Sequence, residues 1–329
     1  MRKLLLVLLC TLMTFSVMAN GQSDASASGE KKLKIGYTVQ SMENAYFVSV
    51  VEGMKVAAKD MGIDLIVADA AADASKHVAH IENFIAQQVD VILISPVDEK
   101  APEDAVANAQ AQGIPVIGIN QTVKGSSAFI GTSEYDFGYN GGIIAGQWLN
   151  EKEAAGTISD VLNKKGEIEV VVIRYDVIAS LIDRGDGLKA GMEETYTGSA
   201  KFDYVFEQDA ADADTGYKVA ETALTANPNV AIFLGINDSS ALGVYEACLA
   251  RKNHTINNTC ITGLDALPQA LELIAGDTMY QGTVDIQPAK LGRDALEIAM
   301  KVLADGPIKE KILIDMKIVT DANIGEYIK

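Results

Sequence analysis

Cysteine, histidine and aromatic residues are scarce in this sequence. The 329 residues include three cysteines and three histidines, and aromatic side chains make up 6% of the chain. His77 and His80 stand three residues apart on one predicted helix, but neither a cysteine nor the third histidine lies near them, so we predict no metal site and expect both to be exposed polar residues. Few aromatic residues beside abundant Ala, Val, Ile and Gly are typical of α/β sheets.

The sequence also has few basic residues and lacks common enzyme motifs. There are 27 Lys and Arg residues against 45 Asp and Glu, a formal net charge of −18. So acidic a surface argues against nucleic acid or an anionic membrane as partner. The sequence has no G-x-S-x-G motif and no P-loop, and the glycine pattern at 185–191 does not directly follow a strand, as dinucleotide binding requires. We therefore predict no enzyme activity and no cofactor.

The first 19 residues have the pattern of a secretory signal peptide. Arg2 and Lys3 precede an apolar run over 4–17, and a small-residue cleavage site follows at Ala19. Cys10 lies inside the apolar run and after Leu9, where a lipidation motif places a small residue, so we do not expect a lipoprotein. Residues 20–32 are small and polar and predict a flexible leader. We expect an exported protein in the periplasm or another extracytoplasmic space, since no later segment is long enough to cross a bilayer.

Apolar runs of strand length that end in polar residues recur along the rest of the chain. The clearest is 230–243, in which an apolar strand ends at a glycine, Asn237 and Asp238 follow, and a helix begins; the same order occurs at 91–96, 116–121, 170–176 and 261–265. Continuous apolar strands that alternate with helices indicate parallel sheets covered on both faces. Ligands bind beyond the carboxyl ends of such strands. The sequence therefore predicts a polar ligand held between strand ends.

Two rounds of strand and helix, with the second beginning near Tyr135, predict two similar lobes. We expect an α/β fold of two Rossmann-like lobes, each a parallel sheet flanked by helices, which face each other across a cleft and close by hinge motion.

Over residues 34–329 the chain resembles the periplasmic sugar-binding proteins of the ribose and galactose/glucose type. The resemblance rests on the segments 44–49, 114–117, 183–187, 237–243 and 263–268. It implies a closed-cleft binder of a monosaccharide or related polyol that acts as a monomer and delivers its ligand to an ABC transporter permease. It also implies one lobe of 31–132 plus 286–314, another of 133–285 plus 315–329, and a three-strand hinge near Thr132, Ile286 and Asp315.

The same resemblance implies the ligand-binding residues. In the first lobe these are Asn44, Tyr46, Phe47 and Asn120, and in the second lobe they are Arg184, Asn237 and Asp265. Carboxylates and amides suit hydroxyls that both donate and accept, an arginine is a charged donor, and a flat ring covers a sugar face. Arg184 could instead form a surface salt bridge, Phe47 could be core, and for Asp238 we prefer a helix N-cap.

Several positions depart from the family pattern. Gln121 replaces a second arginine, Ala211 a stacking aromatic residue, and Ser180 a carboxylate, while a cleft amide falls near Asp285. Tyr175, at another strand end, could supply the missing ring. We therefore expect a ligand other than plain ribose, galactose or glucose. At 161–169, an apolar first position and a lysine at the fifth argue against the calcium loop of the galactose branch.

Cys248 and Cys260 remain after the predicted cleavage, and an oxidising compartment permits a disulfide between them. We predict this bridge, with two buried free thiols as the alternative.

Two other functions share this architecture. A regulator of the lactose-repressor type would begin with a helix-turn-helix, where this chain has the predicted signal peptide. A sensor that signals ligand occupancy to a chemoreceptor, or a binder of a non-sugar molecule, remains open.

Overall fold

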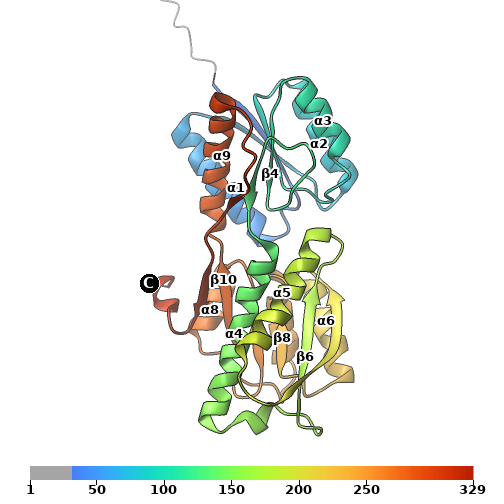
Figure 1. The fold of residues 1–329 in the computed structure, drawn as a ribbon, viewed down its shortest axis with the longest axis vertical. Helices are drawn as coiled ribbons and strands as arrows, with labels where there is room; N and C mark the ends of the chain where they lie inside the picture. Colours follow the sequence, from blue (N-terminus) through green and yellow to red (C-terminus); the bar gives the residue numbers. More distant parts are fainter. Residues whose placement is uncertain (1–31, 329) are drawn as a thin grey trace, which may run out of the picture. The chain divides into compact units, whose positions relative to one another are not determined.

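A computed structural model describes residues 32–328 as two α/β lobes (Figure 1). The predicted signal peptide and nearly all of the predicted leader lie outside the described residues. Within 32–328, no helix is both long enough and apolar enough to span a membrane. The expected fold class is confirmed, because each lobe is built on one mainly parallel sheet with helices on both faces.

The first sheet has six parallel strands in the order β11-β5-β4-β3-β1-β2. The strands are β1 (Lys34–Val39), β2 (Asp64–Asp69), β3 (Val91–Ile94), β4 (Val116–Ile119), β5 (Ala128–Gly131) and β11 (Ile312–Leu313). The helices are α1 (Ala45–Met61), α2 (Ala74–Ala86), α3 (Glu103–Ala111) and α9 (Pro288–Asp305). Helices α1 and α9 pack together on one face, and α2 and α3 lie on the other (Figure 1).

The second sheet has the order β12-β10-β9-β8-β6-β7, and only the pairing of β10 with β12 is antiparallel. The strands are β6 (Glu167–Arg174), β7 (Lys201–Asp209), β8 (Ile232–Leu234), β9 (Cys260–Thr262), β10 (Tyr280–Asp285) and β12 (Lys317–Thr320). The helices are α4 (Glu134–Ala155), α5 (Ala179–Thr195), α6 (Ala213–Ala226), α7 (Asp238–Leu249) and α8 (Pro268–Ala275), with short 3₁₀ turns at Ile158–Val161 and Ile324–Glu326.

The chain passes between the two sheets three times. It leaves the first sheet after β5, returns after β10 to form α9 and β11, and leaves again to form β12. Three neighbouring crossings of this kind give a hinge, since they join the lobes without fixing the angle between them.

Helices α4 and α5 approach so closely that only glycine fits at their crossing. A Cβ atom at Gly142 would lie 2.1 Å from the carbonyl oxygen of Leu188, and one at Gly138 would lie 1.9 Å from that of Arg184. Because the two backbones are in contact, side chains near the start of each helix reach the other helix. This contact places Arg184 beside the first turn of α4.

The expectation that His77 is an exposed polar residue is wrong. His77 is 2% exposed and packs inside the first lobe, where burial lowers the pKa of its ring to about 4. Its position on the inner face of α2 accounts for this, since the apolar residues Ile81 and Phe84 follow on the same face.

Cys248 and Cys260 are free in the structure, against the predicted disulfide. Both thiols are fully buried in the apolar core between α7 and the second sheet. Burial raises the pKa of Cys248 to about 12 and also raises that of Cys260. Each cysteine therefore packs as a small apolar side chain.

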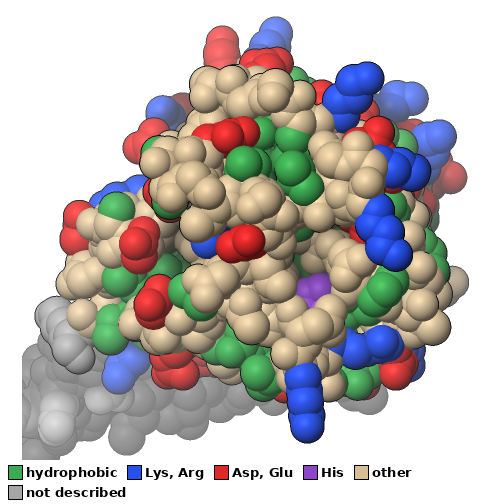
Figure 2. All heavy atoms as spheres, turned by 90° about the horizontal axis from the view of Figure 1, so that it is seen from below, with side chains coloured by type: hydrophobic (Ala, Val, Ile, Leu, Met, Phe, Trp, Pro, Cys, Tyr) green, Lys and Arg blue, Asp and Glu red, His purple; other side chains and the backbone are tan. Residues whose placement is uncertain are grey.

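The surface of the second lobe farthest from the first carries charges of both signs. Figure 2 shows acidic and basic side chains on this face, separated by uncharged surface.

Candidate functional site

A pocket with an empty volume of about 560 Å³ lies between the two lobes. The pocket is formed mainly by residues that directly follow strands β1, β4, β5, β6, β8, β9 and β10. The carboxyl ends of both sheets thus meet at one cavity, as the strand-end pattern predicts.

Nine of the predicted site residues line this pocket. They are Asn44, Tyr46, Phe47, Asn120, Gln121, Tyr175, Arg184, Asn237 and Asp265.

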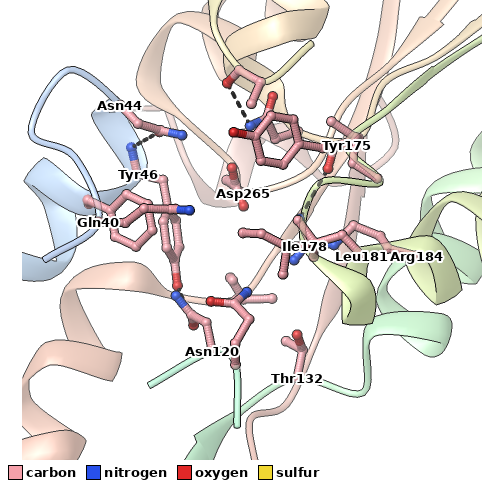
Figure 3. A pocket seen from close by; sticks show the side chains of 16 residues that line it. Gln40, Asn44, Tyr46, Asn120, Thr132, Tyr175, Ile178, Leu181, Arg184 and Asp265 are labelled. Atoms are coloured by element: carbon pink, nitrogen blue, oxygen red, sulfur yellow. Dashed lines mark hydrogen bonds between the residues drawn. The ribbon is translucent and has the colours of Figure 1, made fainter. Parts of the chain in front are cut away.

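Asp265 projects into the centre of the pocket, between Tyr46 of the first lobe and Tyr175 of the second (Figure 3). It is 4% exposed, and its carboxylate has no hydrogen-bond partner among the described residues. Burial raises the pKa of this carboxyl well above its usual value; the carboxylate of Asp238 raises it further, and the Arg184 guanidinium opposes both. A buried carboxylate without donors is costly, so Asp265 is suited to accept hydrogen bonds from a ligand.

The wall in the first lobe combines two rings with two amides. The hydroxyl of Tyr46 donates to Oδ1 of Asn120 over 2.9 Å, and the ring of Phe47 meets that of Tyr46 edge-on, with centroids 5.1 Å apart. Asn44 caps α1 by accepting from the backbone N–H of Tyr46, and its amide nitrogen points toward the pocket (Figure 3). The wall therefore presents a flat surface bordered by fixed polar groups.

The wall in the second lobe carries Tyr175, which directly follows β6. Its ring lies at the pocket near Asp265 (Figure 3), and the small side chain of Ala211 also lines the cavity. Asn237 caps α7 through Oδ1, which accepts from the backbone N–H of Ser240, while its Nδ2 donates to the carbonyl of Ala211 over 2.9 Å. This wall thus carries an aromatic ring at Tyr175 and none at Ala211.

Arg184 lines the pocket and is also half of a buried ion pair. Its Nε donates to Oε2 of Glu134 over 2.7 Å, and Nη1 donates to the carbonyl of Ile236 over 3.2 Å. Its Cζ lies 4.7 Å from the centre of the Phe137 ring. The side chains of Arg184 and Glu134 are 11% and 7% exposed, so the surface salt bridge considered for Arg184 is replaced by a buried one.

Glu134 holds the guanidinium in place, and nothing in the sequence singles it out. Burial raises the pKa of its carboxyl, and the neighbouring Arg184 opposes that rise. An acidic residue in the first turn of a helix is common, and its contact with Arg184 depends on the close approach of α4 and α5.

Other lining residues were also missed. Gln40 follows β1, so the strand-end pattern could have found it. The apolar residues give no comparable signal; they are Ile178, Leu181 and Ile236. Thr132 and Ile286, which we expected only at the hinge, line the pocket as well.

Ser180 and Asp285 do not line the pocket. Ser180 lies in a neighbouring cavity, because Ile178 and Leu181 occupy the faces of this turn that meet the ligand pocket. Asp285 accepts from the backbone N–H of Gln287 and from the hydroxyl of Tyr327. Side chains alternate along an extended chain, so the next residue, Ile286, faces the pocket instead.

The expectation that Asp238 is the N-cap of α7 is wrong, because Asn237 is the N-cap. Asp238 is fully buried and accepts hydrogen bonds from Tyr280, Thr283 and the backbone of Leu267.

One hydrogen bond joins the two lobes beside the pocket. The hydroxyl of Ser239, at the start of α7, donates to Oδ1 of Asn44, at the start of α1, over 3.3 Å.

Two lobes that meet at a pocket lined by polar and aromatic side chains, and that are joined by three crossings, have the architecture of a two-lobe solute-binding protein. The chain belongs to the family described as periplasmic binding protein domain, whose model matches residues 35–307. The ribose import binding protein RbsB of Bacillus subtilis is 30% identical over 297 residues, 90% of each chain. The D-apiose import binding protein of Paraburkholderia graminis is 26% identical over 307 residues, 92% of each chain.

Solved structures show the same fold. A periplasmic solute-binding protein of an ABC transporter from Actinobacillus succinogenes, with bound D-allose, is 25% identical with a TM-score of 0.77, over 90% of this chain and all of that one. The Caulobacter myo-inositol binding protein is 24% identical with a TM-score of 0.75, over 89% of this chain and 95% of that one.

Proposed function

We propose that this protein captures a monosaccharide or related polyol between its lobes and delivers it to an ABC transporter in the membrane. The observation that carries the proposal is the carboxylate of Asp265, which has no hydrogen-bond partner among residues 32–328 and lies in a pocket with Tyr46 and Phe47 on one side and Tyr175 on the other. Aromatic faces pack on the C–H surface of a sugar ring, and a carboxylate accepts from two of its hydroxyls.

The relatives support this class of ligand. Two relatives are named for the import of ribose and D-apiose, and one solved structure contains bound D-allose; all three are neutral monosaccharides. The pocket of this chain has its own set of groups, with Gln121 and Ala211 at positions that depart from the family pattern and Tyr175 at another strand end. Its preferred sugar therefore differs from ribose, galactose and glucose.

Binding without chemistry is the mechanism that the site supports. The ligand favours a closed arrangement because only there does it contact both walls. The bond from Ser239 to Asn44 already joins the two lobes in the described structure. A monomer is sufficient, since both walls belong to one chain. Delivery from the extracytoplasmic side agrees with the export signal expected in the first 19 residues.

Native mass spectrometry of the purified mature protein, with release and identification of any bound molecule, tests this proposal. A bound pentose, hexose or cyclitol is the expected result. A bound amino acid, nucleoside or organic acid would keep the fold and overturn the ligand class. If the protein is purified empty, a thermal-shift comparison with D-ribose, D-allose, D-apiose and myo-inositol decides, and no shift with any neutral sugar or polyol contradicts the proposal.

A sensing role is the second candidate, since a closed lobe surface can be recognised by a chemoreceptor as well as by a permease. Deleting the gene separates the two: loss of ligand uptake indicates transport, and loss of chemotaxis with uptake unchanged indicates sensing.

A further inference from the structure

Asp238 lies behind the pocket and ties together the segments around Asp265. Its Oδ1 accepts from the hydroxyl of Tyr280 over 2.7 Å and from that of Thr283 over 2.8 Å. Its Oδ2 accepts from the backbone N–H of Leu267 over 2.7 Å. Tyr280 and Thr283 belong to β10, and Leu267 ends the turn after β9. One buried carboxylate thus connects the start of α7 with β10 and with the turn that carries Asp265.

That turn has an unfavourable backbone conformation. Asp265 has a φ of 114° and Ala266 a φ of 54°, values that residues with a Cβ atom rarely adopt. Such a conformation persists only when its surroundings hold it. Here the N–H of Asp265 donates to the carbonyl of Val284 over 2.9 Å, and the N–H of Ala266 donates to Oγ1 of Thr283 over 3.1 Å.

Thr283 therefore acts as a relay. Its Oγ1 accepts from the turn at Ala266 and donates its own proton to Asp238. The chain before the turn is equally close to the carboxylate, because a Cβ atom at Gly263 would lie 2.2 Å from Oδ1 of Asp238 and 1.9 Å from the hydroxyl oxygen of Tyr280. The turn has no room to move toward Asp238, and its hydrogen bonds keep it from moving away.

We propose that Asp238 is a positioning residue: through Thr283 and Leu267 it holds the turn 264–267 in the conformation that directs the Asp265 carboxylate into the pocket. Asp238 does not touch the ligand. A carboxylate suits this position because it accepts three hydrogen bonds, whereas the amide of asparagine would turn an NH₂ group toward one or more donors. The part of the proposal that concerns ligand affinity rests on the proposed function.

Amide hydrogen exchange in the ligand-free protein tests the placement of the turn. In Thr283→Val and Asp238→Asn, the amides of Ala266 and Leu267 should exchange at least ten times faster than in the wild type. The amide of Cys260, which donates to Ala231 inside the sheet, should keep its protection and so show that the lobe stays folded. Unchanged protection at both turn amides in both variants would overturn the proposal.

Thr262→Val is the matched control. Thr262 is fully buried on β9, the neighbour of β10, and its hydroxyl has no hydrogen-bond partner among the described residues. The same substitution therefore removes a buried hydroxyl of the same kind without touching the turn. We expect its exchange rates at Ala266 and Leu267 to match those of the wild type.

Affinity for the best-bound of D-ribose, D-allose, D-apiose and myo-inositol tests the consequence at the site. Thr283→Val should raise Kd about tenfold or more and Thr262→Val should leave it within twofold, since a misplaced carboxylate loses charge-assisted bonds to the ligand. To exclude a merely structural role, the Kd of both substitutions is measured again in an Asp265→Asn background. There, Thr283→Val should no longer raise Kd. A penalty that persists there contradicts positioning through Asp265. If no compound binds, the proposed function fails, and the exchange comparison alone decides on the turn.

Discussion

The guanidinium of Arg184 is held by Glu134, with Nε and Oε2 2.7 Å apart, and not by Asp265. Asp265 and Arg184 act on each other only through their charges. Glu134 thus neutralises the arginine of the pocket, while the central carboxylate has no hydrogen-bond partner in the described part of the chain. Asp265 is therefore available to a ligand.

Removal of the Glu134 carboxylate should destabilise the second lobe. Glu134→Ala leaves a buried guanidinium without its ion partner, a change that costs about 3–5 kcal/mol in the free energy of unfolding. Urea unfolding followed by circular dichroism measures it.

The matched control is the exposed pair of Glu52 and Lys55, whose side chains are 60% and 53% exposed. Glu52→Ala should change the free energy of unfolding by less than about 1 kcal/mol. Equal effects of the two substitutions would show that Glu134 is not buried with Arg184 as described.

Tyr175 should contribute to affinity through its ring. Tyr175→Ala removes the aromatic surface of the second-lobe wall and should weaken ligand binding by about 1–2 kcal/mol, on the scale of a partly buried apolar side chain. Tyr175→Phe keeps the ring and should bind within about twofold of the wild type. Calorimetric titration separates the two, and an affinity unchanged in Tyr175→Ala would remove Tyr175 from the site.

His77 should make stability depend on pH between about 4 and 6.5. Its pKa is about 4 in the folded protein and near 6.5 when exposed, so the unfolded chain binds more protons in this window. The free energy of unfolding should therefore fall by about 3 kcal/mol from this group as the pH drops from 6.5 to 4.

His77→Leu should remove that part of the slope, and Ser75→Ala, at an exposed position of the same helix, should retain it. Denaturant titrations at several pH values give the comparison. A wild-type slope in His77→Leu would mean that the ring is solvated.

The two cysteines should behave as buried thiols. In guanidinium without reductant, both Cys248 and Cys260 should react with a thiol reagent, and in buffer neither should react quickly, because burial raises the pKa of both. Added reductant should leave the midpoint of thermal unfolding unchanged. Thiols that titrate only after reduction would restore the predicted disulfide.

The pocket residues that could be predicted from the sequence are those whose position depends on a single strand. Asn120, Asn237 and Asp265 each follow an apolar strand of a parallel sheet, and the ends of such strands meet wherever the sheets face each other. The prediction for Asp285 is wrong by one residue, because Ile286 lines the pocket instead. Side chains alternate between the two sides of the chain at the end of β10, and the sequence pattern does not specify which of the two residues faces the pocket.

Contacts between distant elements could not be predicted in this way. Glu134 reaches Arg184 because α4 and α5 touch at Gly138, and Asp238 is buried because β10 brings Tyr280 and Thr283 to it. Both depend on how helices and strands pack, which local patterns do not specify.

The central claim is that Asp265 binds a neutral sugar or polyol in the pocket, and calorimetric titration of the wild type, Asp265→Asn and Asp285→Asn tests it most directly. Asp285 is the matched control, since it stands at the end of β10 but does not line the pocket. With D-ribose, D-allose, D-apiose and myo-inositol as ligands, at least one should bind the wild type and Asp285→Asn alike, and Asp265→Asn should lose about 2–4 kcal/mol of binding free energy. Equal affinities of Asp265→Asn and the wild type would contradict the account.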